Sequence, residues 1–180
     1  MNFVQPIRDP EKIAEMKKYL LQRSKRNYIL FIIGINTGLR ISDILQLKKE
    51  DLLQTHLKLR EKKTRKEKRI RIPPAIRKEL IEYAKTLKDG EYAFRSRQGG
   101  NRPIDRSTAY RILREAAEYV SLDEVGTHTL RKTFGYHFYQ QTKDVAMLQE
   151  LFNHSSPHIT LKYIGVNQDA MDKAMMKYKI

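Results

Sequence analysis

The spacing of apolar residues predicts a series of helices that is interrupted once by short strands. A first helix is expected to begin after Asp9, an N-cap residue followed by proline, because apolar residues then recur at helical spacing. A second is expected from Ser24 through Ile35, with Gly38 at its end, and it is apolar on almost every side. Since a helix without a polar face must be covered all round, we expect it at the centre of the core.

Alternating polar and apolar residues predict strands at Thr55–Leu59 and Arg69–Ile72, and Tyr92–Arg95 are expected to add a third. Further helices are expected over residues 42–47, 74–87, 107–120, 128–141 and 144–152, in a short segment from 156 that carries Tyr163, and over 168–178. We therefore expect residues 1–180 to form one domain. Its fold class is α+β and mostly α-helical, with a small three-stranded antiparallel sheet.

The balance of charges indicates a nucleic acid as the partner. The 180 residues carry 36 Lys and Arg against 21 Asp and Glu, a formal net charge of +15. Such an excess is typical of proteins that neutralise phosphates, although a merely basic soluble protein would also show it. With no cysteine, disulfides and cysteine-based zinc sites are excluded. The longest apolar run, Tyr28–Ile35, is too short to cross a bilayer, so we expect a cytoplasmic protein with no membrane partner.

Nearly half of this net charge lies in the predicted hairpin. Residues Lys58–Arg71 hold nine Lys and Arg against two Glu, a net charge of +7, in a shape suited to lie along a phosphate backbone. The stretch Arg95–Arg114 adds six arginines against one aspartate, and its helix is a candidate to enter a DNA groove. The candidate DNA-binding residues are Lys62, Arg65, Lys66, Lys68, Arg69, Arg106 and Arg111.

Three short motifs carry the residues with candidate chemistry. The first is a Gly-Leu-Arg segment at a helix–helix junction, with an acid three residues on. The second is a His-x-x-Arg pair on one helical face, and the third is a Phe-Asn-His segment followed by a tyrosine nine residues after the histidine. In chain order these residues are Arg40 with Asp43, His128 with Arg131, and His154 with Tyr163.

Taken together and in this order, the motifs resemble the tyrosine recombinase (phage integrase-type) family, over about Asp9 to Ile164. The family pattern adds a lysine in a β-hairpin, which falls here on Lys63. The resemblance implies the DNA breaking–rejoining enzyme fold. It also implies a site-specific recombinase or integrase that cleaves and rejoins DNA through a covalent 3′-phosphotyrosine, in integration, excision or inversion. The catalytic residues it implies are Arg40, Lys63, His128, Arg131, His154 and Tyr163, with Asp43 supporting Arg40.

The chemistry of phosphodiester cleavage accounts for these residue types. Arg40 and Arg131 can bind the charge that develops on the non-bridging phosphate oxygens. Tyr163 is the expected nucleophile, and His128 and His154 are the candidates to accept its proton or to hydrogen-bond the phosphate. In the family the hairpin lysine protonates the leaving 5′ oxygen, and Lys62 and Lys66 are alternatives to Lys63 for that role.

No metal ion, ATP or other cofactor is expected. Two guanidiniums can replace the metal that many phosphoryl-transfer enzymes use, and the phosphotyrosine retains the bond energy needed for rejoining. His154 and His158 have the i, i+4 spacing of some zinc sites. Neither a cysteine nor a nearby acid completes a ligand set around these two histidines.

The sequence departs from the family pattern at three places. Asn153 stands where many members have glycine, and asparagine also tolerates a left-handed backbone. Lys132 stands where many have a second histidine. The N-terminal core-binding domain of many members is expected to be absent, so the chain is either a cut piece or a naturally short member.

The resemblance implies double-stranded DNA as the partner, at the bacterial or phage nucleoid. It also implies a homo-tetramer on DNA, a monomer as an option in solution, and accessory DNA-bending proteins. The C-terminal helix, about residues 167–180, docks on a neighbouring protomer or packs on its own core. This helix has an apolar stripe of Ala170, Met171, Ala174, Met175 and Tyr178.

The rival functions are a topoisomerase-like or resolvase-like role, a DNA-binding regulator that has lost the reaction, and a basic RNA-binding protein.

Overall fold

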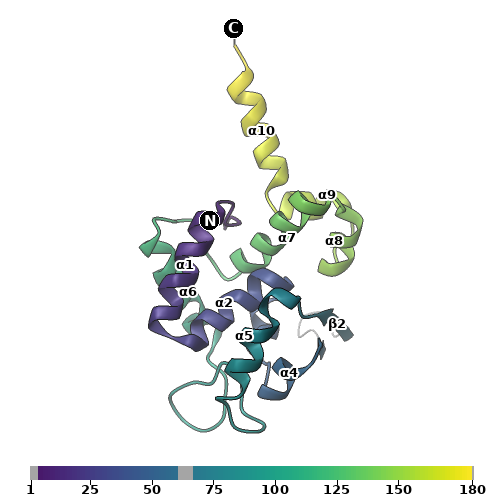
Figure 1. The fold of residues 1–180 in the computed structure, drawn as a ribbon. Helices are drawn as coiled ribbons and strands as arrows, with labels where there is room; N and C mark the ends of the chain where they lie inside the picture. Colours follow the sequence, from purple (N-terminus) through teal and green to yellow (C-terminus); the bar gives the residue numbers. More distant parts are fainter. Residues whose placement is uncertain (1–3, 61–66, 180) are drawn as a thin grey trace.

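The structure, a computed structural model, describes residues 4–60 and 67–179 (Figure 1). It confirms a mostly helical α+β fold. The helices are α1 (Pro10–Arg23), α2 (Lys25–Thr37), α3 (Ile41–Ile44), α4 (Lys49–Leu53), α5 (Pro74–Ala84), α6 (Arg106–Tyr119), α7 (Thr129–Thr142), α8 (Val145–Phe152), α9 (Pro157–Tyr163) and α10 (Val166–Lys177). The strands are β1 (His56–Arg60) and β2 (Glu67–Arg71).

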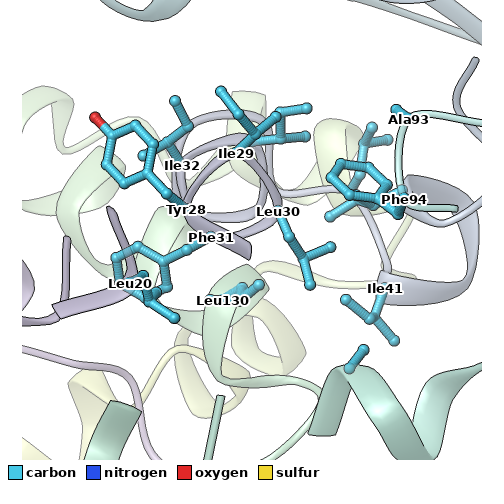
Figure 2. Packing of buried hydrophobic residues seen from close by; sticks show 14 of the residues in the cluster. Leu20, Tyr28, Ile29, Leu30, Phe31, Ile32, Ile41, Ala93, Phe94 and Leu130 are labelled. Carbon is cyan, nitrogen blue, oxygen red and sulfur yellow. The ribbon is translucent and has the colours of Figure 1, made fainter. Parts of the chain in front are cut away.

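Helix α2 lies at the centre of the core, as its apolar composition predicts. The Ser24 side chain accepts a hydrogen bond from the Asn27 backbone N–H at its start, and Gly38 ends it in a left-handed conformation with φ of 63°. The helix contacts α1, α5 and α7. Figure 2 shows its side chains entering the core in several directions, with Leu20 of α1 and Leu130 of α7 among their neighbours.

The sheet of the described residues has two strands, so the third strand expected at Tyr92–Arg95 is wrong. β1 and β2 pair antiparallel with Leu57 opposite Ile70. The 92–95 segment makes its backbone hydrogen bonds elsewhere, because Ala93 N–H donates to Leu47 O at 2.8 Å and Arg95 pairs only with Pro103 in an isolated bridge. The short helix α4 was not predicted, since five mostly charged residues show no apolar period.

A second, smaller apolar cluster joins α8 and α9 to the second half of α7. Its fully buried members are Leu148, Phe152 and Ile164. Gly135 of α7 allows this close packing, because a Cβ there would lie 2.6 Å from Ile164 Cγ2 and 2.8 Å from Phe152 Cε2. The helix that ends at Tyr163 therefore lies against α7 at a distance that only glycine permits.

Helix α10 projects away from the rest of the protein (Figure 1). None of its described residues is buried, so the alternative that its apolar stripe packs on its own core is wrong. Exposed fractions of 55% for Met171, 70% for Met175 and 66% for Tyr178 leave this stripe in solvent. In the described part of the chain, no helix combines the length and apolarity needed to cross a membrane.

The contact at Gly135 gives a stability prediction. Gly135→Ala should lower the free energy of unfolding by about 1–3 kcal/mol, because buried Ile164 and Phe152 have no room to move away from the new methyl group. This loss should appear although alanine is the better helix former by about 1 kcal/mol. Urea unfolding measures it, with Gly100→Ala as the matched control.

At Gly100 a new methyl group would meet no atom within 4 Å, so this substitution tests the general effect of glycine-to-alanine exchange. That exchange should leave stability unchanged or raise it by up to about 1 kcal/mol. Equal stabilities of the two variants would contradict the close packing of α7 against Ile164.

Candidate active site

The residues of the three motifs come from separate elements whose ends meet. Each lies at or next to the end of a helix, where the backbone turns and the side chain can leave the helical bundle. Arg40 is the N-cap of α3, His128 is the N-cap of α7, Arg131 lies in the first turn of α7, His154 follows α8, and Tyr163 ends α9.

Arg131 connects these segments. Its guanidinium is 3% exposed and donates from Nη1 to Gly38 O at 2.6 Å and from Nη2 to Phe152 O at 2.8 Å. Its Cζ also lies 4.1 Å from the centre of the Phe152 ring. Gly38 lies two residues before Arg40, and Phe152 lies two residues before His154. Through these two hydrogen bonds, the Arg131 side chain joins the start of α7 to the segments that carry Arg40 and His154.

Tyr163 is enclosed by aromatic rings. Its ring centre lies 5.1 Å from that of His154, 5.6 Å from that of Phe152 and 6.5 Å from that of His128, all in edge-to-face geometry. Its hydroxyl oxygen is buried, and no described residue makes a hydrogen bond of good length and angle with it. Burial raises the pKa of Tyr163, while the positive charges of Arg131 and Arg40 oppose that rise. The Tyr163 phenol is thus a buried group under the influence of two guanidiniums.

His154 is held neutral near physiological pH. Burial, and then the charges of Arg131, Arg40 and Lys68, lower its pKa to about 4. Its Nδ1 lies 3.0 Å from the Thr160 hydroxyl, which itself donates to Ser156 O at 3.3 Å. Because Thr160 has already used its proton, it accepts one from His154 Nδ1. This network assigns the proton to Nδ1 and leaves Nε2 as an acceptor.

The turn before His154 confirms the expectation for Asn153. This residue adopts a left-handed conformation with φ of 54° and caps α8. The backbone N–H of His154 donates to Gln149 O at 3.0 Å, which fixes the direction in which the imidazole leaves the turn. Asparagine therefore forms the left-handed turn that the sequence led us to expect at this position.

Arg40 and His128 line a hollow of about 920 Å³ beside this cluster. His128 is exposed, whereas Asp43, one turn into α3, is only 4% exposed. The hollow continues to the start of α6, where Arg106 also lines it. The structure thus brings Arg131, His154 and Tyr163 together in one cluster, and it places Arg40 and His128 at the hollow beside that cluster.

Most of the basic hairpin tip lies outside the described residues. This applies to Lys62, Lys63, Arg65 and Lys66. Lys68 of β2 is placed at the site itself, because its Nζ donates to Leu151 O and its charge helps to lower the pKa of His154. The charge run marked Lys68 as a DNA-binding residue and gave no signal of this position. Arg69 is exposed, and its Nη2 lies 3.4 Å from His56 Nδ1.

A second hollow of about 650 Å³ lies on the other side of the Pro103–Asp105 segment. Four arginines line it: Arg26, Arg97, Arg102 and Arg111. Burial and the charge of Arg97 lower the pKa of Arg26, which shows that these cations lie close together. Only Arg111 was predicted to bind DNA. Arg26 comes from the start of α2, far away in sequence, so charge counting along the chain could not find it.

Among residues 4–60 and 67–179, no group of three His, Cys, Asp or Glu side chains is placed to hold a metal ion. His154 directs Nδ1 to Thr160, and His158 is exposed on α9.

Comparison with known proteins agrees with this geometry. Residues 9–170 match the model of the phage integrase family, so the chain belongs to that family. The chain is 54% identical over 181 residues to a protein of Bacillus subtilis (strain 168) named probable integrase/recombinase YoeC, covering 100% of this chain and 98% of that protein. It is 32% identical over 156 residues to tyrosine recombinase XerD of Corynebacterium glutamicum, covering 81% of this chain and 50% of XerD.

Solved structures show the same fold. The XerA recombinase superimposes with a TM-score of 0.75 at 20% identity, over 98% of this chain and 65% of XerA. The lambda integrase dimer bound to a COC' core site gives a TM-score of 0.70 at 18% identity, over 91% of this chain and 48% of that protein. The chain thus spans about half to two thirds of these larger recombinases, although it matches nearly all of the Bacillus protein.

The lowered pKa of His154 predicts how stability depends on pH. Between about pH 6.5 and 4 the unfolded chain binds a proton at this histidine that the folded protein does not. The free energy of unfolding should therefore fall as the pH drops through this window. In His154→Gln the fall should be smaller, which urea unfolding at several pH values measures.

His158→Gln is the matched control, since it removes an exposed histidine four residues away and retains His154. Its pH dependence should follow that of the wild type. If His154→Gln also follows the wild type, then His154 is not held neutral in the folded protein.

Proposed function

We propose that this protein is a site-specific recombinase that cleaves and rejoins DNA through a covalent bond between Tyr163 and a 3′-phosphate. The observation that carries this proposal is the buried Tyr163 hydroxyl. The charges of the Arg131 and Arg40 guanidiniums oppose the rise in the pKa of Tyr163 and lower the pKa of His154. Membership of the phage integrase family supports it. The XerH structure captured after cleavage of its difH substrate, at a TM-score of 0.72, shows a fold of this kind on DNA.

In the proposed reaction the Tyr163 oxygen attacks phosphorus, and the bond from phosphorus to the 5′ oxygen breaks. Arg40 and Arg131 stabilise the added negative charge on the non-bridging oxygens. Loss of either guanidinium should raise the barrier by roughly 3–4 kcal/mol, by analogy with the loss of one oxyanion donor. Asp43 supports Arg40 from its buried position on α3. Attack by a 5′ hydroxyl on the phosphotyrosine reverses these steps and rejoins DNA without ATP.

Two protons must move in this reaction. The phenolic proton leaves Tyr163, and the acceptor Nε2 of His154 supports that residue as its recipient, with His128 as the second candidate at the mouth of the hollow. The leaving 5′ oxygen takes a proton from a hairpin lysine. Lys63 is assigned to this step, with Lys62 and Lys66 as the alternatives.

We place the DNA along the two hollows. The first contains Arg40 and His128, and the second contains the four arginines, with α6 and the shared Pro103–Asp105 segment between them. Lysines and arginines that line such a path release counterions from the phosphates and favour binding to any duplex. The hairpin adds Lys68 and Arg69 at one end of the path, and Arg106 and Arg111 lie on α6.

The assembly on DNA is proposed to be a homo-tetramer, helped by accessory DNA-bending proteins at the nucleoid of a bacterial or phage-infected cell. The apolar stripe of α10 supports contact between protomers, because the side chains of Met171, Met175 and Tyr178 are exposed to solvent in the described structure. We infer that α10 docks on a neighbouring copy once DNA brings the copies together.

Covalent trapping tests the proposed reaction. Wild-type protein is incubated in EDTA with supercoiled plasmid that carries the DNA flanking its own gene, then denatured and examined for DNA-linked protein. An adduct should form with the wild type and disappear in Tyr163→Phe, because phenylalanine has no oxygen to attack phosphorus.

Three outcomes would contradict parts of this proposal. An adduct that persists in Tyr163→Phe would mean that another residue is the nucleophile. An adduct that forms only with added divalent metal would contradict the role of the two arginines in place of a metal. Intact DNA binding with no adduct would favour a regulator that binds DNA without cutting it.

Truncation tests the docking of α10. Deletion of residues 171–180, which removes the exposed Met171, Met175 and Tyr178 but keeps Asp169 and its ion pair with Arg8, should abolish strand exchange between two sites, because the apolar contact between protomers is lost. Folding of the monomer should be retained, since α10 buries none of its described residues. Recombination assays and urea unfolding measure the two effects. Unchanged strand exchange in the truncated protein would show that α10 has no part in assembly.

A further inference from the structure

The segment before α1 crosses the face of α7 and connects to the far end of the chain. We call residues 4–8 the N-terminal strap. The Ile7 backbone N–H donates to Thr133 Oγ1 at 2.9 Å, and Ile7 O lies 2.9 Å from His137 Nε2. The Gln5 N–H donates to Glu124 O at 2.9 Å. These contacts, each over more than a hundred residues of sequence, fix the strap on α7 and on the segment before it.

Arg8 joins the strap to the junction between α9 and α10. Its Nε donates to Asp169 Oδ1 at 2.8 Å, and its Nη2 lies 3.5 Å from Gly165 O. Both Nη atoms are held by Gln5 Oε1 at 3.1 Å. Gly165 adopts a left-handed φ of 84° and lies two residues after Tyr163. The helix that bears Tyr163 is therefore tied to the strap at its C-terminal end.

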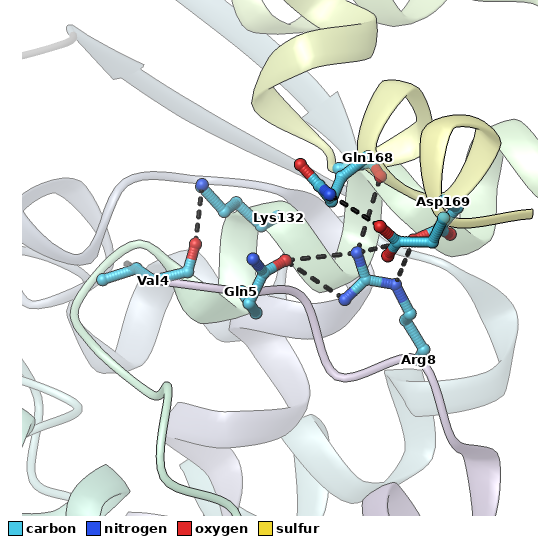
Figure 3. A network of polar contacts seen from close by, with 8 residues as sticks. Val4, Gln5, Arg8, Lys132, Gln168 and Asp169 are labelled. Atoms are coloured by element: carbon cyan, nitrogen blue, oxygen red, sulfur yellow. Dashed lines mark hydrogen bonds and ion pairs between the residues drawn. The ribbon is translucent and has the colours of Figure 1, made fainter. Parts of the chain in front are cut away.

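Lys132 joins the strap to the Tyr163 ring itself. Its Nζ donates to Val4 O at 2.8 Å and lies 5.2 Å from the centre of the Tyr163 ring (Figure 3 shows the first contact). A cation at this position attracts the face of the ring. Burial, and then the charge of Arg8, lower the pKa of Lys132.

We propose that the N-terminal strap positions Tyr163 for attack, with Arg8 and Lys132 as its two positioning residues. The proposal rests on Tyr163 as the nucleophile. It follows from the geometry, because the strap holds the Tyr163 segment at two points: the ring through Lys132, and the backbone after it through Arg8. Asp169, the acidic partner of Arg8, lies in the first turn of α10, so this second point also includes the start of that helix. A nucleophile displaced by about 1 Å loses on the order of 100-fold in rate.

Cleavage kinetics with four variants test the proposal. Arg8→Gln and Lys132→Gln should each form the DNA adduct about 10-fold to 100-fold more slowly at saturating DNA, while the Kd for the duplex changes by less than about twofold. Arg8→Lys should recover most of the rate, because a lysine can still pair with Asp169. The matched control is Arg23→Gln, which removes an exposed arginine whose Cζ lies 4.7 Å from the Tyr19 ring on α1 and should keep the wild-type rate.

A second readout does not depend on activity. Nitration of tyrosines by tetranitromethane, mapped by mass spectrometry, should spare Tyr163 in the wild type because its hydroxyl is buried, and should reach it in Arg8→Gln and Lys132→Gln. Two tyrosines calibrate the reaction in every sample. Tyr178 is 66% exposed and should react, whereas Tyr83 is 7% exposed, donates to Ala93 O at 2.6 Å and should stay protected.

The two readouts distinguish failure of the strap proposal from failure of the proposed function. Slower adduct formation together with nitration of Tyr163 supports the proposal. A wild-type adduct rate in Arg8→Gln and Lys132→Gln overturns it, as does a slower rate with Tyr163 still protected. If the wild-type protein itself forms no adduct, the proposed function fails, and the protection of Tyr163 in the variants alone decides whether the strap holds it.

Discussion

The buried guanidinium of Arg131 is the interaction on which the site depends. A cation that is 3% exposed must be compensated, and the protein compensates it with the carbonyls of Gly38 and Phe152. These carbonyls lie at the C-terminal ends of α2 and α8, where helix dipoles place partial negative charge. The same side chain thus joins two helix ends in the folded protein, and in the proposed reaction it also binds the phosphate. If the proposal holds, stability and phosphate recognition are coupled in one residue.

The positive charges also set the protonation of the site before DNA arrives. Burial raises the pKa of Tyr163. For His154, burial and then the neighbouring cations lower the pKa to about 4. The phenol therefore keeps its proton in the absence of substrate, since the nearby imidazole is a weak base. A bound phosphodiester brings negative charge that offsets the guanidiniums and raises the pKa of His154. In the proposed reaction, this arrangement would make Tyr163 reactive only where a phosphate is present.

Local sequence signals predicted the helices and the motif residues well. Ser24 as a cap, Gly38 as a helix end and Asn153 as a left-handed turn each follow from the conformations these residues tolerate. The failures concern hydrogen bonds that local patterns do not encode. The segment 92–95 has a strand-like composition but finds its partners in loops. Likewise, the contact of Arg8 with Asp169 spans 161 residues and leaves no periodic signal in the chain.

The position of α10 follows from what holds each of its ends. At its N-terminal end, which we call the root, Arg8 of the strap donates hydrogen bonds to Asp169 and to the Gly165 carbonyl. Farther along the helix, the methionines and Tyr178 are exposed to solvent. Docking on a second protomer would bury that apolar surface and pull on the helix. Because the root lies two residues from Tyr163, any movement of the root would reach the nucleophile. If the proposed docking and cleavage both occur, the ion pair of Arg8 and Asp169 lies where movement of α10 would be passed to Tyr163.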